Sequence, residues 1–138
     1  MMNLVNGRTD QTIASAVEMA DTRATRRQGL LGRRHMDVAS ALILVPCCAV
    51  HTAFMRFPID VVFVNRDGLV MRVSRRLAPW RVAIAPGAYA AVELAAGAAE
   101  LRGVKVGDRL YTRSGDGFES VSSFFASVSL RKMAPVSR

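Results

Sequence analysis

The sequence contains few of the residues that build disulfide frameworks and metal centres. Its two cysteines, Cys47 and Cys48, are adjacent, and its two histidines are His35 and His51. Neighbouring cysteines rarely bridge each other, because a disulfide requires a particular Cα separation and side-chain direction. A structural zinc site normally needs four ligands, and these four residues are badly spaced for one. We therefore expect free thiols in a reducing compartment and no metal.

Long apolar runs are also missing. No run reaches the roughly 18 residues that cross a bilayer, and the first residues, MMNLVNGRTDQT, lack the basic start and apolar core of a secretory signal. These absences predict a cytoplasmic protein without a membrane span. The 138 residues are 51% hydrophobic and 22% charged, which indicates one folded domain with a sizeable core.

Acidic residues are scarce, and the net charge is +8. Residues 21–36 carry five arginines and one aspartate, and residues 71–86 carry four arginines and no acid. Such segments can meet nucleic acid, anionic lipid or an acidic protein partner, although a solvated surface is the simpler interpretation. Aromatic and basic residues are not interleaved as they are in single-strand binding proteins, so nucleic acid is disfavoured.

Local patterns predict short strands and one or two short helices. A helix is expected after Asp21 or Thr22 as N-cap, with Gly32 as C-cap and Arg23, Arg26, Arg27 and Leu30 on one face. The clearest hairpin joins residues 59–65 to 69–74 around the turn residues Asp67 and Gly68. The other strands are predicted in residues 12–21, in the buried run 41–46, in WRVAIA and YAAVELAAG, and after Gly107-Asp108, with a helical turn in AAELRG.

This order of elements predicts a mostly β (α+β) fold, a compact barrel-like or rolled antiparallel sheet with one or two short helices. We expect a single β-rich domain in residues 1–113. Residues 114–138 are rich in serine and glycine, and we expect them to form a polar, mobile tail.

The segment CCAVHTAFMRFPID, residues 47–60, concentrates polar groups in an apolar context. A cysteine thiolate activated by a nearby histidine is a nucleophile, so Cys47 with His51 is one candidate pair. On a straight strand, however, the two would lie roughly 13 Å apart at ~3.3 Å per residue. Free cysteine is also commonly a buried small hydrophobe.

Two acids interrupt apolar runs, Asp60 in FPIDVVFV and Glu93 in AVELAAG. A buried carboxylate without partners is costly, so Asp60 is expected either to pair with Arg56 or backbone amides, or to form one polar pocket with Arg56, His51 and Thr52. Glu93 is expected to be a strand residue that faces water.

The strings RQGLLGR, ALILVPC, VHTAFMRFPIDVVFVNRDGLV, APWR, AVELAAG and GVKVGDRL occur in this order between residues 12 and 111. In this the chain resembles the family called domain of unknown function 192. The resemblance implies a β-rich, compact, barrel-like domain, and it brings no established reaction, substrate or cofactor. The characteristic positions that it implies here are Cys47, His51, Thr52, Met55, Arg56, Asp60, Arg81, Glu93, Gly97, Gly107 and Asp108.

The resulting hypothesis is a non-enzymatic ligand-binding or accessory module with a polar pocket around His51, Arg56 and Asp60, for a small polar or anionic ligand. One alternative is a small thiol-dependent enzyme, and another is a domain that binds nucleic acid or an anionic partner through its arginine-rich segments. No cofactor is identified. The candidate pocket residues are Cys47, His51, Thr52, Met55, Arg56, Asp60, Arg81 and Glu93.

Overall fold

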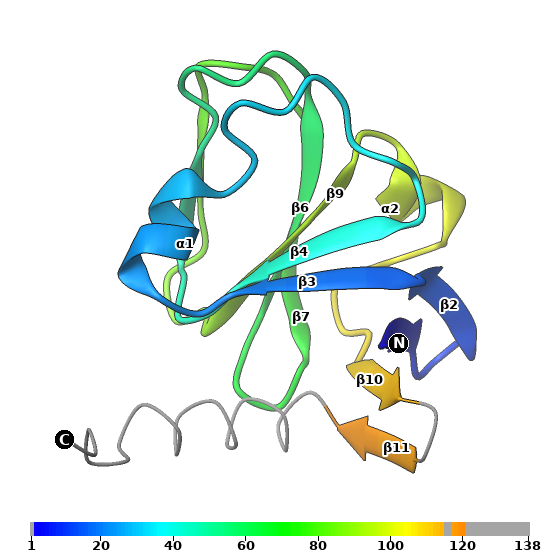
Figure 1. Ribbon diagram of the computed structural model, residues 1–138. Helices are drawn as coiled ribbons and strands as arrows, with labels where there is room; N and C mark the ends of the chain where they lie inside the picture. Colours follow the sequence, from blue (N-terminus) through cyan, green and yellow to red (C-terminus); the bar gives the residue numbers. More distant parts are fainter. Residues whose placement is uncertain (1, 115–116, 121–138) are drawn as a thin grey trace, which may run out of the picture.

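The computed structural model describes residues 2–114 and 117–120, which form three β-sheets and two short helices (Figure 1). The central sheet has five strands in the order β3-β4-β9-β6-β7. Only its β3–β4 pair is parallel, and the other neighbours are antiparallel. Its strands are β3 (Ala16–Ala20), β4 (Ser40–Leu44), β6 (Ile59–Val64), β7 (Val70–Leu77) and β9 (Ala90–Ala95).

Both faces of this sheet are covered, which explains the continuous apolar runs in its inner strands. Alternate side chains of a strand point to opposite faces, and in β4 Ala41 and Ile43 join one buried cluster while Leu42 and Leu44 join the other. The cluster of Ala41 and Ile43 includes Leu4 and therefore lies against a second sheet.

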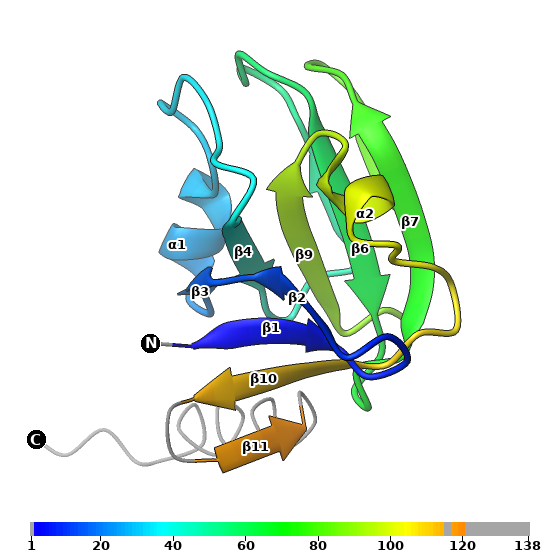
Figure 2. The same cartoon turned by 90° about the vertical axis from the view of Figure 1, so that its right-hand side faces the viewer.

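The second sheet has the order β11-β10-β1-β2, and Figure 2 shows it below the five-stranded sheet. Its strands are β1 (Asn3–Asn6), β2 (Gln11–Ala14), β10 (Leu110–Ser114) and β11 (Gly117–Ser120). The predicted mostly β fold is confirmed as rolled sheets, which do not close into a barrel. Strand β11 extends the sheet past residue 113, and residues 121–138 of the predicted tail lie outside the described residues.

The opposite face of the five-stranded sheet is covered by α1 (Arg23–Gln28) and by a two-stranded sheet of β5 (Ala49–His51) and β8 (Val82–Ile84). Helix α1 begins at the predicted N-cap Thr22, whose side chain accepts a hydrogen bond from the Thr25 amide. It ends at Gly29 and not at Gly32, because Gly29 takes a φ of 46°, a value that glycine adopts at low cost.

The observed strands test two further sequence predictions, the hairpin at 59–74 and the single strand at 12–21. The predicted 59–74 hairpin is confirmed as β6 and β7, with a turn in which the Gly68 amide donates to the Asn65 carbonyl. The predicted single strand 12–21 is wrong, since it divides at Ser15 into β2 and β3, which belong to different sheets. Among the described residues, no helix is long and apolar enough to cross a membrane.

Asp60 is fully buried, and its carboxylate accepts hydrogen bonds from backbone amides. One carboxylate oxygen accepts a hydrogen bond from the Arg76 amide at 2.8 Å, at an irregularity in the β6–β7 pairing where Arg76 has a φ of 50°. The other oxygen accepts from the Gly97 and Ala99 amides at 3.0 and 2.9 Å, at the start of α2 (Ala98–Leu101). Asp60 thus ties β6, β7 and α2 together.

The Asp60→Ala variant is predicted to lose about 3 kcal/mol of unfolding free energy, because three backbone amides, one buried and two part-buried, lose their carboxylate acceptor. The measurement is urea unfolding followed by circular dichroism. Asp67→Ala, at an exposed turn position at the other end of β6, is the matched control and should change stability by less than about 0.5 kcal/mol. Equal stability of the two variants would contradict this role of Asp60.

Candidate functional site

A cavity of about 460 Å³ lies between α1 and the five-stranded sheet. The helix side contributes Arg26, Arg27 and Leu30, and the sheet side contributes Leu44 and Glu93. The wall is completed by residues 46–51, which run from Pro46 to the end of β5, and by Met55. The complete lining is Arg26, Arg27, Gln28, Gly29, Leu30, Leu31, Leu44, Pro46, Cys47, Cys48, Ala49, Val50, His51, Met55 and Glu93.

Backbone hydrogen bonds hold the walls of the cavity in place. The Cys47 amide donates to the Tyr89 carbonyl, and the Ala85 amide donates to the Cys48 carbonyl, so the segment before β5 is bonded to the segment after β8. On the helix side, the Arg26 guanidinium donates to the carbonyls of Asp21 and Val45, which joins α1 to the end of β4. The cavity is therefore bounded by fixed elements.

Glu93 is the unusual member of this lining. It lies on β9 between Leu42 of β4 and Val61 of β6, and it is only 4% exposed. Its carboxyl oxygen Oε2 has no hydrogen-bond partner within the part of the chain that the structure describes. The prediction that Glu93 faces water is therefore wrong, because helix α1 and the 46–55 segment cover this face of the sheet.

Burial without a partner shifts the acidity of this group. Desolvation raises the pKa of Glu93 from its ordinary value of 4.5 to about 7, and the positive charge of Arg33 opposes part of that rise. Arg33 is itself paired with Glu18 at 2.7 Å. The site thus holds a carboxyl group that changes its charge near neutral pH.

The two cysteines differ in their surroundings. Cys47 is half-buried and its thiol donates to the Ala49 carbonyl at 3.1 Å, whereas Cys48 is exposed. Desolvation is the main cause that raises the pKa of the Cys47 thiol, with a smaller contribution from the charge of Glu93. The thiol form, which is a poor nucleophile, is therefore favoured at neutral pH.

The structure divides the eight predicted pocket residues into two groups. Cys47, His51, Met55 and Glu93 line the cavity. Thr52, Arg56, Asp60 and Arg81 do not, so the expected grouping of Asp60 and Arg56 with His51 does not occur at this cavity. Asp60 faces the opposite side of the sheet, because it is paired with Leu94 in a register that places Val61 and Glu93 on the cavity side.

Thr52 organises the neighbouring loop. Its side chain is fully buried, its hydroxyl donates to the Ala78 carbonyl at 2.6 Å, and the same oxygen accepts from the Arg81 amide at 2.8 Å. The Thr52 amide in turn donates to the Arg81 carbonyl. Thr52 therefore fixes residues 78–81 against the 52–55 segment, while the side chains of Arg56 and Arg81 are exposed.

Sequence reasoning missed the helix side of the cavity. The spacing of Arg26, Arg27 and Leu30 indicated one helical face, but it did not indicate what that face covers. Only the tertiary arrangement, in which α1 contacts β3 and Arg26 bonds to the Val45 carbonyl, brings these residues to the cavity that Glu93 also lines. Among the described residues, no group of three or more histidine, cysteine, aspartate or glutamate side chains is arranged to hold a metal ion.

The Glu93→Gln variant is predicted to be more stable than the wild type at neutral and alkaline pH. The pKa of Glu93 is higher in the folded state than in the unfolded state, so its contribution to the stability of the fold is fully present at pH values below the unfolded pKa. This contribution is lost as the pH rises through the folded pKa of about 7. The stability difference between the variant and the wild type should therefore grow by about 3 kcal/mol from pH ~4.5 to above pH ~7.

Urea unfolding across this pH range measures the difference. Glu100→Gln, at an exposed position on α2, is the matched control and should show no such trend. A pH-independent difference between Glu93→Gln and the wild type would show that Glu93 is not the desolvated group described above.

Comparisons with known proteins agree with this fold. Two crystal structures match at a TM-score of 0.69. One is of a protein from Sinorhizobium meliloti 1021 described as a "putative transcription regulator", 24% identical, with 79% of this chain and 89% of that chain covered. The other is of a protein of unknown function from Novosphingobium aromaticivorans DSM 12444, 23% identical, with 79% and 81% covered. At these identities the likeness shows the fold alone.

The search among curated proteins found no match. The model of the DUF192 family, described as "Uncharacterized ACR", matches residues 4–112 and so includes the five-stranded sheet, the β5–β8 sheet and the cavity lining. The chain therefore belongs to the DUF192 family.

Proposed function

We propose that this chain binds a small, partly apolar molecule in the cavity beside Glu93, and that this molecule donates a hydrogen bond to the Glu93 carboxyl group. One observation carries the proposal: a buried carboxyl oxygen without a partner among the described residues belongs to a residue that lines the cavity. Buried polar groups are almost always hydrogen-bonded. An exception at a cavity of ligand size, which is about 300–1,000 Å³ in general, favours a partner from outside the chain.

The apolar lining favours a ligand with a hydrocarbon part. Leu30, Leu31, Leu44, Val50 and Met55 surround the cavity, and contact with such side chains removes apolar ligand surface from water. The single buried acid then fixes the orientation of the ligand, as a few placed polar groups do in ligand pockets.

The charged side chains that line the cavity indicate which chemical class of ligand it would bind. At neutral pH a protonated amine is the best partner for Glu93, because its positive charge favours the ionised carboxylate. On the helix side, Arg27 is exposed and lines the same cavity, so an anionic group elsewhere on the ligand would be complementary to it. We therefore favour primary amines with an apolar part, including zwitterionic amino acids.

This proposal differs from thiol catalysis at Cys47. The raised pKa of the Cys47 thiol supports a protonated side chain, and its hydrogen bond to the Ala49 carbonyl supports a packing role. Nucleic-acid binding by the arginine-rich segments is the disfavoured alternative, and the engagement of Arg26 of the first segment with backbone carbonyls does not support it.

The test is a thermal-shift and NMR titration of the full chain with three matched series: primary alkylamines and apolar amino acids, the corresponding alcohols, and the corresponding carboxylates. We predict that the amine series raises the melting temperature by mass action. Its affinity should increase as the pH rises through about 7, because an ammonium group binds the ionised form of Glu93.

Glu93→Gln should reduce the affinity for the amines about tenfold or more, since the charged hydrogen bond is lost. Glu100→Gln is the matched control and should bind as the wild type does. An amine response that survives in Glu93→Gln, or no response to any series, would contradict the proposal and leave a hydrated cavity without a ligand.

A further inference from the structure

Four large apolar side chains remain exposed on the segments that follow the cavity wall, at residues 54 and 80–84. They are Phe54, Trp80, Val82 and Ile84, with 74%, 59%, 62% and 49% of their surface exposed. The rings of Phe54 and Trp80 are in contact, with centroids 4.6 Å apart. Val82 and Ile84 are two residues apart on β8 and so share a face. We call these four residues the aromatic face.

The aromatic face is held rigidly and at a conformational cost. Phe54 and Trp80 both have a φ of 64°, a value that bulky side chains rarely adopt. The Thr52 carbonyl accepts from the Trp80 amide at 3.1 Å, and the Thr52 hydroxyl bonds fix Ala78 and Arg81 on either side of it. Such strain persists only where the surroundings enforce it, and it concentrates at functional sites.

The two chain segments that carry the aromatic face have charges of one sign. Residues 46–59 and 71–89 contain five arginines and no acidic residue. The guanidinium of Arg72 donates to the Ile84 carbonyl, and that of Arg81 donates to the Trp80 carbonyl at 3.1 Å. Arg56 is exposed two residues after Phe54. Positive charges therefore lie directly beside the exposed apolar side chains.

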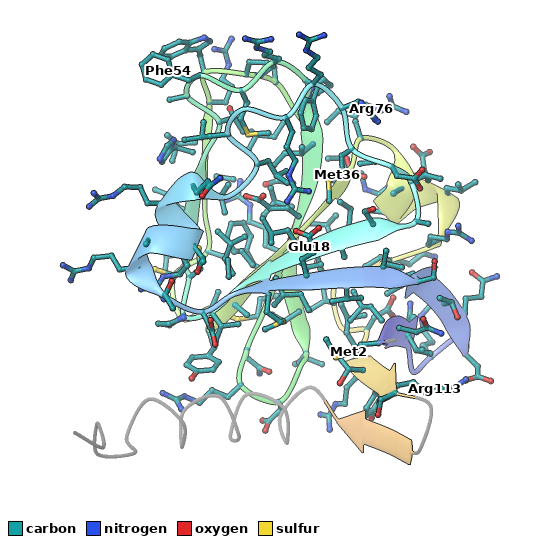
Figure 3. The ribbon with its side chains drawn as sticks, in the orientation of Figure 1. Met2, Glu18, Met36, Phe54, Arg76 and Arg113 are labelled. Carbon is teal, nitrogen blue, oxygen red and sulfur yellow. The ribbon has the colours of Figure 1, made fainter. Side chains whose placement is uncertain are left out.

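The aromatic pair of this face lies at one end of the molecule. Figure 3 shows Phe54 at the end opposite to the sheet that contains β10 and β11, and the ring of Trp80 is in contact with the ring of Phe54. Residues on protruding loops can reach a flat surface without rearrangement of the fold. Aromatic side chains, with an apolar body and a polar edge, are suited to the boundary between water and hydrocarbon.

We propose that the aromatic face docks this protein onto an anionic membrane surface. Phe54 and Trp80 enter the boundary between headgroups and acyl chains, and Arg56, Arg72 and Arg81 contact lipid phosphates. Apolar burial and electrostatic attraction add in this mode of binding, and arginines near an anionic leaflet strengthen it. His51, opposite Val82 in the β5–β8 pair, lines the cavity, so the cavity adjoins the docked surface.

Trp80 is the only tryptophan of the chain, and its fluorescence therefore reports directly on the proposed contact. The experiment titrates the full chain with vesicles of phosphatidylcholine alone and of phosphatidylcholine with phosphatidylglycerol. Sedimentation and Trp80 emission are both recorded. We expect binding to the anionic vesicles, accompanied by a blue shift of the emission, and much weaker binding to the neutral vesicles.

Phe54→Gly is the decisive variant, because glycine accepts the positive φ without strain and so should preserve the stability of the fold. It should weaken vesicle binding about tenfold or more, since the buried ring contributes about 1.5–3 kcal/mol. Leu101→Ala, at a site on α2 that is 69% exposed, is the matched control and should bind as the wild type does.

Four results would overturn the proposal: no binding to anionic vesicles, binding without a blue shift, equal binding to neutral vesicles, or full binding by Phe54→Gly. Poly-glutamate serves as a parallel probe. A blue shift with poly-glutamate but not with vesicles would assign the aromatic face to an acidic protein partner and exclude the membrane. None of these results depends on the ligand proposed for the cavity.

Discussion

The pairing of β6 with β9 at the centre of the five-stranded sheet is the constraint on which the rest of the structure depends. Its register places Asp60 opposite Leu94 and Glu93 opposite Val61, so that two buried acids project to opposite faces of one sheet. Asp60 receives three backbone amides and joins β7 and α2 to the sheet. Glu93 has an oxygen without a partner among the described residues. One acid therefore stabilises the fold, and the other costs free energy when it is ionised.

The sheet face that carries Glu93 adjoins the aromatic face. Helix α1 and the 46–55 segment enclose the cavity, and β5 and β8 continue from it to the aromatic face. A strained backbone at Phe54 and Trp80 and a desolvated carboxyl at Glu93 are both departures from the most stable arrangement. Natural proteins accept such departures at functional sites and compensate for them elsewhere. The two proposals concern adjoining surfaces but rest on separate observations.

The sequence predicted local structure well, because hydrophobic periodicity and turn chemistry are local signals. It placed the 59–74 hairpin and the Thr22 N-cap, and it identified a buried run that became β4. The sequence did not show which of the two buried acidic residues would be hydrogen-bonded by the rest of the chain. Asp60 and Glu93 both interrupt apolar runs, and only the long-range contacts of Asp60 with Arg76, Gly97 and Ala99 distinguish them. Likewise, the role of α1 as a cavity wall depends on packing between distant segments.

The central claim is that Glu93 is a desolvated acid available to a ligand. The most direct test is an NMR titration of the Glu93 side-chain carboxyl carbon in the free protein, with Glu93→Gln used to assign the signal. We expect a titration midpoint, and hence a pKa, of about 7. A midpoint near the ordinary value of 4.5 would show that the carboxylate is already well solvated or hydrogen-bonded, and it would remove the basis for a ligand at this site.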